Sequence, residues 1–336
     1  MNEKEPMKYT RREFVKLAGV VGGGAMIAGG SLMLGRKMFK KDEDGIVLSD
    51  TAMSTFVTIS IFGKDRKDSE RIAKLALSRM RTLEKDLTRF QSSGAPAILN
   101  RNKELSNVSG DMKHIIETSM MVQRESEGAF DPSILPVLKA VKNGRSISDV
   151  KELRKMTGEG AYTFNGSTIK LKNNEVELTF DGVAKGFIID AVVKTLQQNG
   201  VKNMIIEAGG DVQTVGNHPA SRPFVIGIKH PRHAGQIAQL KLNGRAVATS
   251  GDYERNYNSS YTKHHLIDPK TGDSANAVAS ATVVAPNAML ADAWSTALFV
   301  LGADKGIKLL ESIGEIDGFV VTKNGGTQKT SRFPLV

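Results

Sequence analysis

Three clusters of polar side chains lie between residues 248 and 302, each beside a tight turn or within one predicted helix. They span residues 250–253, 264–272 and 290–297 and contain carboxylates, hydroxyls and imidazoles. Such groups can hold a hard cation, contact a phosphate or move a proton. The stretch therefore carries the side chains needed for chemistry on a phosphate-containing ligand.

Asp292 and Thr296 are four residues apart in a segment that predicts an apolar helix, with Asn287 suited to begin it and Gly302 to end it. The spacing places the carboxylate and the hydroxyl on one face. A carboxylate in apolar surroundings is costly unless something compensates it. Mg²⁺ or Ca²⁺ would do so. The alternatives are a polar stripe that faces solvent, or a hydrogen bond from Thr296 to a backbone carbonyl.

Two adjacent histidines, His264 and His265, precede the segment 268–272, whose sequence Asp-Pro-Lys-Thr-Gly fits a β-turn. If these histidines lie on a strand, their side chains point to opposite faces, so that one could face a cleft and the other solvent. Taken alone, a histidine is more often structural than catalytic. The sequence leaves the catalytic and the structural alternatives open.

A glycine-rich stretch further upstream predicts two turns within a strand–turn–helix–strand unit. The predicted strand 176–180 leads into the turn 181–186 and the helix 187–198; the strand 201–206 ends in the turn 207–211. Glycines allow close approach of a ligand, and a helix N-terminus offers free N–H groups to an anion. The spacing matches neither a Walker loop nor a dinucleotide fingerprint. Phosphate binding and two ordinary tight turns both remain open.

The remaining elements predict the frame that must position these groups. Helical periodicity marks three segments, and alternation or short apolar runs mark several strands. We expect helices at 68–87, 110–126 and 134–141, a polar stretch at 142–149, strands at 52–63, 246–249, 264–268 and 280–284, and a closing hairpin at 319–323 and 326–335. The mixture predicts an α+β fold with mixed, largely antiparallel sheets and packed helices.

The N-terminal segment has a different character. Residues 10–16, Thr-Arg-Arg-Glu-Phe-Val-Lys, match the twin-arginine export pattern, and residues 17–35 are weakly apolar and rich in glycine. That run is just long enough to span a bilayer, so it could remain as an anchor. We expect residues 1–45 to be an export signal, or anchor, with a linker. The protein would pass through the twin-arginine machinery to the periplasm or the outer face of the cytoplasmic membrane.

Composition narrows the function classes. The 336-residue chain contains no cysteine, which excludes disulfides, zinc–thiolate sites and thiol catalysis. Its formal charge is +10, of which residues 1–41 supply +6. The basic balance therefore mostly reflects the export signal, and we predict no nucleic-acid partner.

Eight segments, taken in order, resemble the ApbE family, the FAD:protein FMN transferases. They lie at 53–59, 87–90, 128–132, 181–186, 207–211, 248–253, 265–272 and 291–297. The resemblance runs from about residue 50 to the C-terminus. It implies that residues 46–336 form an ApbE-like (T-fold-like), two-lobed domain with a central cleft for FAD.

The resemblance also implies a set of site residues. Mg²⁺ at the pyrophosphate of FAD would be bound by the Ala184 carbonyl, the Asp292 carboxylate and the Thr296 hydroxyl. His265 and Asp252 would lie nearest the chemistry, with His265 our preferred general base and Asp252 its rival. The residues expected to bind the cofactor are Met53, Phe90, Ala129, Phe130, Asp131, Asp181, Lys185, Leu266 and Ile267.

The implied reaction is Mg²⁺-dependent transfer of FMN from FAD to a Ser or Thr hydroxyl of an exported or membrane flavoprotein, with release of AMP. The acceptor would carry a Ser/Thr-Gly-Ala-Thr-like motif, in a subunit of a redox-driven ion pump or in an exported flavin reductase. Two alternatives use the same site. One is hydrolysis of FAD to FMN and AMP, and the other is binding of FAD without turnover.

Overall fold

The computed structural model describes residues 45–145, 147–219 and 222–336, and the first of these ranges begins with strand β1. The predicted export signal and the segment 17–35 lie outside the described residues. Within the described ranges, no helix combines the length and the apolar character that a bilayer crossing requires.

One eight-stranded sheet forms the frame of the molecule, and each of its described strand pairs is antiparallel. Its interior strand β11 is buried along its whole length, so its sequence is an uninterrupted run of small and β-branched residues. In spatial order the strands are β1 (Gly45–Ala52), β2 (Thr55–Phe62), β6 (Asn203–Ala208), β7 (Asp211–Val215), β10 (Ala246–Gly251), β11 (Val278–Ala285), β12 (Asp317–Thr322) and β13 (Thr327–Lys329).

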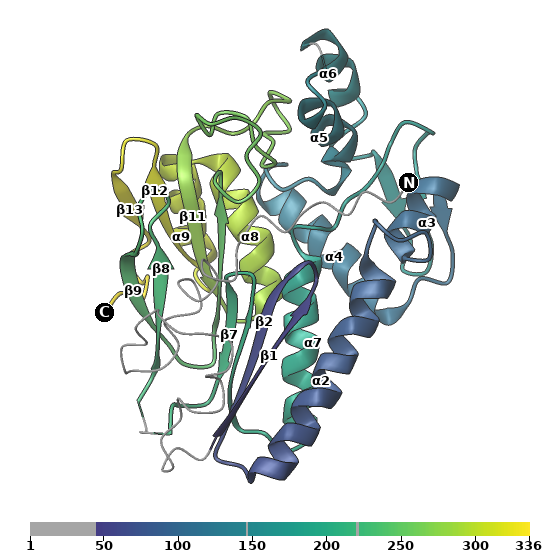
Figure 1. Cartoon of the computed structure of the whole chain (residues 1–336). Helices are drawn as coiled ribbons and strands as arrows, with labels where there is room; N and C mark the ends of the chain where they lie inside the picture. The colour runs from purple at the N-terminus through teal and green to yellow at the C-terminus, as the bar shows by residue number, and fades with distance from the viewer. Residues whose placement is uncertain (1–44, 146, 220–221) are drawn as a thin grey trace.

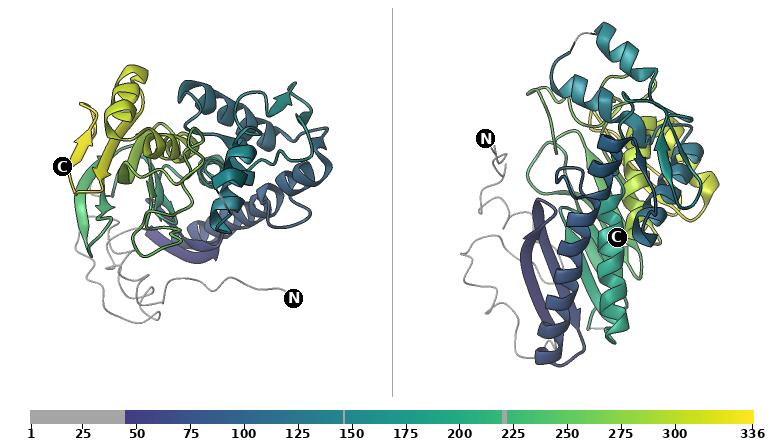
Figure 2. Two further views of the ribbon diagram at one scale, coloured as in Figure 1. Left: turned by 90° about the horizontal axis from the view of Figure 1, so that it is seen from above. Right: turned by 90° about the vertical axis from the view of Figure 1, so that its right-hand side faces the viewer.

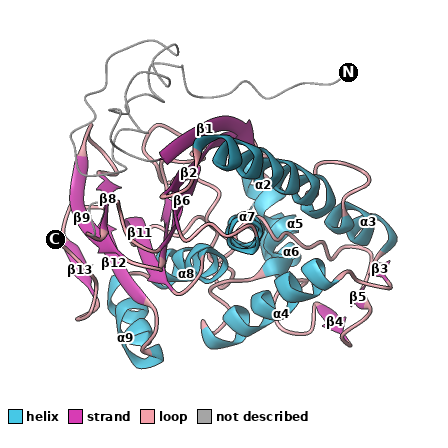
Figure 3. Cartoon of the chain, turned by 90° about the horizontal axis from the view of Figure 1, so that it is seen from below, coloured by secondary structure: helices cyan, strands magenta, loops and turns pink. Residues whose placement is uncertain are grey.

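The two faces of this sheet bury different layers, because side chains alternate along each strand. On β6, for example, Met204 and Ile206 belong to the core beneath the helices, whereas Ile205 packs into a second core beneath the hairpin β8–β9. Figures 1 and 3 show the helices on one face and the hairpin on the other. The elements are α2 (Arg66–Leu87), α7 (Ala184–Gln198), α8 (Ala288–Leu301), α9 (Ala303–Ile313), β8 (Phe224–Lys229) and β9 (Gln236–Leu242).

A second lobe lies on the side of α7 and α8 away from the sheet (Figure 2). It is mainly helical and includes a small three-stranded antiparallel sheet in the order β3-β5-β4. Its elements are α3 (Ala95–Asn102), β3 (Glu104–Leu105), α4 (Gly110–Glu125), the 3₁₀ turn η2 (Pro132–Ile134), α5 (Leu135–Lys142), α6 (Ile147–Arg154), β4 (Tyr162–Phe164) and β5 (Ile169–Leu171).

Several predicted elements are confirmed with small shifts at their ends. The helices expected at 68–87 and 110–126 are α2 and α4, and the Asp65 and Ser109 side chains accept hydrogen bonds from their first turns. The helix with Asp292 begins after Asn287, whose side chain accepts from Leu290 N at 2.9 Å. The α+β class with antiparallel sheets is confirmed as well.

The predicted strand 176–180 is wrong, because its backbone pairs with side chains instead of with another strand. Asn100 Oδ1 accepts a hydrogen bond from Leu178 N at 2.7 Å, and Asn100 Nδ2 donates to Leu178 O at 2.8 Å. The Lys103 ammonium donates to the carbonyl of Val176 at 3.0 Å. These hydrogen bonds satisfy backbone groups of Val176 and Leu178 without a β-ladder.

Other boundaries also differ from the sequence prediction. The strand expected at 52–63 is interrupted by a two-residue turn at Met53 and Ser54, which makes the hairpin β1–β2. The strand expected at 264–268 is a loop with two isolated bridges. Helix α6 begins at Ile147, inside the segment 142–149 that was predicted only as a polar stretch.

Candidate active site

Helices α7 and α8 pack closely where the predicted metal ligands lie. The Gly186 N–H donates to Asp292 Oδ2 at 3.1 Å, although the two residues are 106 positions apart. A Cβ on Gly186 would lie 2.2 Å from the Ala288 carbonyl oxygen, so only glycine fits there. Asp292 is 6 % exposed, which rules out the solvent-facing polar stripe for this carboxylate.

Thr296 lies one helical turn beyond Asp292, between the end of β10 and the turn 181–183; the predicted turn 181–186 is shorter than expected because α7 begins at Ala184. Its hydroxyl is 3.4 Å from Ser250 Oγ, which in turn is 2.8 Å from Ser295 Oγ. A Cβ on Gly182 would lie 3.2 Å from Thr296 Oγ1. The structure therefore brings the carboxylate, the hydroxyl and the glycine-rich turn together.

A partly buried ion pair borders this pair of helices. The Lys185 ammonium, near the start of α7, pairs with Asp211, which is 1 % exposed at the start of β7. Burial would lower the pKa of Lys185, but the Asp211 and Asp292 carboxylates outweigh it and hold the pKa above its ordinary value. Burial raises the pKa of Asp292, and Lys185 opposes that rise. Asp211 was not among the predicted site residues; its place after a glycine pair was the only signal in the sequence.

The donors at this point fit Mg²⁺. They are a buried carboxylate that needs a positive neighbour, a hydroxyl, and the Ala184 carbonyl at the first residue of α7. Across the described ranges, no three His, Cys, Asp or Glu side chains gather as a metal cluster. Mg²⁺ bound here would take its other ligands from water and from phosphate oxygens, as it commonly does in proteins.

The part of the site that we expect to contact the flavin contains an exposed aromatic ring. Phe90 is 70 % exposed, and the Arg89 guanidinium lies 4.1 Å from its ring centroid. Arg89 also donates to Asp181 at 3.0 and 2.9 Å. Two predicted residues, Phe90 and Asp181, are thus linked through a third that the prediction missed. An exposed ring of this kind offers a face on which a planar group can stack.

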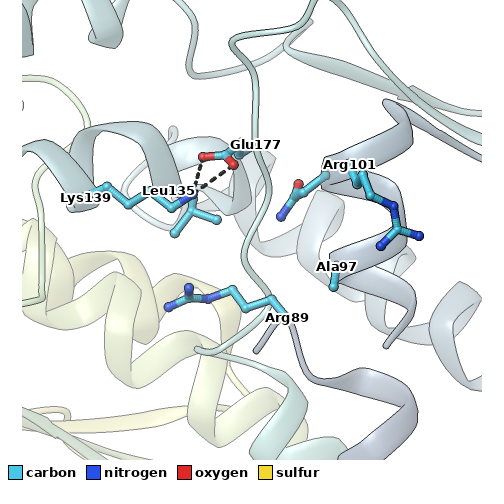
Figure 4. Close-up of a pocket in the computed structure, with 7 residues that line it drawn as sticks. Arg89, Ala97, Arg101, Leu135, Lys139 and Glu177 are labelled. Atoms are coloured by element: carbon cyan, nitrogen blue, oxygen red, sulfur yellow. Dashed lines mark hydrogen bonds and ion pairs between the residues drawn. The ribbon is translucent and has the colours of Figure 1, made fainter. Parts of the chain in front are cut away.

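A cleft of about 250 Å³ borders Arg89 on the side of α3 and α5 (Figure 4). Its charged side chains are already partnered, since Lys139 pairs with Glu177 at 2.6 Å and Arg89 pairs with Asp181. The cleft lies beside the candidate site and does not contain its predicted residues. The lining consists of Arg89, Ala97, Asn100, Arg101, Leu135, Lys139 and Glu177.

Met53 has an unusual backbone conformation. Met53 and Ser54 form the β1–β2 turn with φ values of 53° and 57°, a left-handed conformation that is strained for residues other than glycine. This turn lies against the β6–β7 turn, because Gly209 N donates to the Phe56 carbonyl at 3.2 Å. Met53 therefore lies at the same end of the sheet as Asp211.

The predicted segment 129–131 is buried between the two lobes. A Cβ on Gly182 would lie 3.3 Å from the Phe130 ring, so Phe130 borders the glycine-rich turn. Asp131 Oδ1 accepts from Gln123 Nε2 at 2.7 Å and from Ser133 Oγ at 2.6 Å, while its buried Oδ2 has no hydrogen-bond partner among the described residues. Burial raises the pKa of Asp131. Ala129 is 5 % exposed.

The adjacent histidines differ in their surroundings. His264 is fully buried and packs edge-on against Phe299 of α8, with ring centroids 5.5 Å apart. His265 is partly exposed, and its buried Nδ1 has no hydrogen-bond partner within the described part of the chain. Burial lowers the pKa of His264 to about 4 and that of His265 to about 3. Both imidazoles are therefore neutral at pH 7, and only His265 is partly exposed.

Asp252 is held by two cations. It is fully buried, and its oxygens accept from Arg232 at 2.7 and 2.6 Å and also from Lys323. A carboxylate engaged in this way anchors three loops, and the geometry favours His265 over Asp252 as a base. The next predicted residues, Leu266 and Ile267, are 6 % and 5 % exposed and pack into apolar cores.

Comparison with known proteins identifies the family and agrees with this fold. Residues 53–320 match the model of the ApbE family, and the chain therefore belongs to that family. A FAD:protein FMN transferase from Klebsiella pneumoniae (strain 342) is 32% identical over 229 residues, which cover 65% of this chain and 71% of that protein. The FAD:protein FMN transferase from Escherichia coli (strain K12) is 28% identical over 307 residues, 86% of this chain and 87% of that protein.

A solved structure shows the same architecture. The ApbE protein from Thermotoga maritima has a TM-score of 0.79 to this chain at 28% sequence identity, with 86% of this chain and 97% of that chain covered. The family and the fold class predicted from the sequence are confirmed, and the predicted enzyme class is that of the named relatives.

Proposed function

We propose that this protein transfers FMN from FAD to a Ser or Thr hydroxyl of another protein and releases AMP, with Mg²⁺ as cofactor. The observation that carries the proposal is the pairing of Asp292 and Thr296 on α8 with the start of α7. The names of the relatives supply the flavin chemistry. In the reaction, the acceptor oxygen forms a bond to the phosphorus of FMN, and the bond from that phosphorus to the bridging oxygen of AMP breaks.

Asp292, Thr296 and the Ala184 carbonyl would hold the metal at the pyrophosphate. Bound there, Mg²⁺ would polarise the phosphorus and stabilise the leaving AMP. The Lys185 ammonium adds a positive charge at the same place, and Asp211 keeps it there. Holding the attacking oxygen and the AMP in line would supply much of the rate.

His265 is our choice for the base that accepts the proton of the acceptor hydroxyl. Its imidazole is neutral at pH 7 because burial keeps its pKa near 3, so it is free to accept a proton. The same low pKa makes it a weak base. A weak base of this kind is effective only when it is held within hydrogen-bond reach of the acceptor hydroxyl.

The test combines purified protein, FAD, Mg²⁺ and an acceptor domain that carries a Ser/Thr-Gly-Ala-Thr-like segment. We expect a flavin-fluorescent acceptor band after denaturing electrophoresis, together with one AMP per flavin transferred. AMP release without acceptor labelling, across a panel of acceptors, would instead indicate hydrolysis of FAD. Tight FAD binding without any AMP would indicate a flavin-binding protein and would overturn the proposal.

We also propose export by the twin-arginine route and an acceptor outside the cytoplasm, in a redox-driven ion pump or an exported flavin reductase. The proposal rests on the pattern at residues 10–16. Replacing Arg11 and Arg12 by lysine should retain the protein in the cytoplasm, as followed by cell fractionation. Unchanged export of that variant would refute this route.

A further inference from the structure

Asp190, in the middle of α7, accepts hydrogen bonds from the first turn of α8. Its Oδ1 accepts from Ala288 N at 2.8 Å and its Oδ2 from Met289 N at 2.9 Å. Asn287, just before α8, caps the next free N–H, that of Leu290. The N-terminus of α8 is therefore capped by its own Asn287 and by a carboxylate from another helix. A charge-assisted bond at the positive end of a helix dipole is a strong contact.

The contacts along α8 form three levels, each four residues from the next; two are made by α7 and one by Gly182, in the turn just before α7. Asp190 meets the residue pair 288–289, Gly186 meets Asp292, and Gly182 meets Thr296. Residue numbers rise along one segment while they fall along the other, so the two run antiparallel in fixed register. Residues four apart share a helix face, so the three levels lie on one face of α8, and Gly186 and Asp190 lie on one face of α7; this line of contact is the seam.

Two of these levels hold the proposed metal ligands, Asp292 and Thr296, opposite the segment that presents the Ala184 carbonyl. The level at Asp190 carries none of those ligands, but there a single side chain accepts two hydrogen bonds. Gly186 allows the two helices to approach closely, since a Cβ there would overlap the Ala288 carbonyl. The Asp190 contact restricts sliding along the seam, because its two oxygens meet two consecutive N–H groups.

We propose that Asp190 is a positioning residue which fixes the register of α7 against α8 and thereby sets the spacing between the Ala184 carbonyl and the Asp292 and Thr296 oxygens. The inference rests on the Mg²⁺ site of the proposed function. Burial raises the pKa of Asp190 to about 6, so measurements at pH 8 keep the carboxylate ionised.

The test measures cation affinity apart from turnover. Mn²⁺ is titrated into the protein at pH 8 in the presence of FAD, without acceptor, and free Mn²⁺ is followed by electron paramagnetic resonance. We compare the wild-type protein, Asp190→Asn, Asp190→Ala and Asp65→Ala. The last is a matched control, because Asp65 caps the start of α2 through Lys67 N at 2.8 Å and Asp68 N at 3.4 Å, on a helix without proposed ligands.

We expect both Asp190 variants to raise the dissociation constant for Mn²⁺ at least tenfold, and Asp65→Ala to leave it unchanged even where its melting temperature falls. If the alanine variant does not fold, Asp190→Asn decides the matter, since it retains one acceptor oxygen. Wild-type affinity in Asp190→Asn would show that Asp190 is only a helix cap and would overturn the inference. A wild-type protein that binds no Mn²⁺ with FAD present would instead refute the metal site of the proposed function.

Discussion

The Gly186 N–H donates a hydrogen bond to the Asp292 carboxylate across the interface of α7 and α8, at 3.1 Å. The bond explains two residue choices at once. Glycine at 186 lets the backbones approach, and aspartate at 292 faces an N–H at the start of a helix, where a negative charge is favoured. One bond and Lys185 nearby compensate this buried carboxylate only partly, since burial still raises its pKa. A bound cation would complete the compensation.

The first prediction concerns Asp292→Ala. We expect AMP release from FAD to fall on the order of 100-fold or more, because the only carboxylate proposed to hold Mg²⁺ is lost. The fold should remain, since the change removes a buried charge. Activity is measured over a Mg²⁺ titration beside a circular dichroism spectrum. Asp86→Ala, an exposed change on α2, serves as control. Normal turnover of Asp292→Ala would refute the metal assignment.

The second prediction concerns Gly186→Ala. Its Cβ would lie 2.2 Å from the Ala288 carbonyl oxygen, and the backbone there cannot move without separating α7 from α8. We expect a loss of about 3 kcal/mol in the free energy of unfolding, in the upper part of the range for overpacking. Urea denaturation provides the measurement. Gly110→Ala is the matched control, because no atom lies within 4 Å of its added Cβ; equal stability losses in the two variants would contradict the steric explanation.

The sequence predicted the local parts of the site because they depend on spacing along one helix or turn. Asp292 and Thr296 share a face whatever lies opposite, and Asn287 and Gly302 mark the helix ends by their own chemistry. Asp190 was missed for the opposite reason. Its partners are the N–H groups of a helix 98 residues further on, and nothing within α7 indicates them.

The same distinction explains the errors in the fold. The segment 176–180 has the composition of a strand, but Asn100 satisfies its backbone from α3. Arg232 and Lys323 likewise reach Asp252 from distant loops, and no local pattern around residue 252 indicates them. Long-range side-chain partners of this kind leave no periodic signal.

The third prediction separates His265 from Asp252. His265→Gln should lower flavin transfer to the acceptor about 100-fold, the usual contribution of a general base, and leave the melting temperature nearly unchanged. Asp252→Asn should instead lower the free energy of unfolding by about 3 kcal/mol, because it removes the charge between Arg232 and Lys323. Initial rates per folded molecule and urea denaturation give the two readouts. A stable Asp252→Asn variant that has lost its activity would reverse the assignment.

The fourth prediction follows from His264. Burial, with Lys323 adding to it, lowers the pKa of His264 to about 4, whereas an unfolded histidine has a pKa near 6.5. Between these two values the unfolded chain binds a proton that the folded chain does not, so the free energy of unfolding falls as the pH decreases from 6.5 towards 4. At pH 5 this one group should cost about 2 kcal/mol relative to pH 7.5. His264→Asn should remove the contribution of His264 to this pH dependence. The contribution of the partly exposed His265 should remain. Urea denaturation of both proteins at pH 5 and pH 7.5 gives the difference, and identical pH dependence in the two would show that the buried imidazole is not the group responsible.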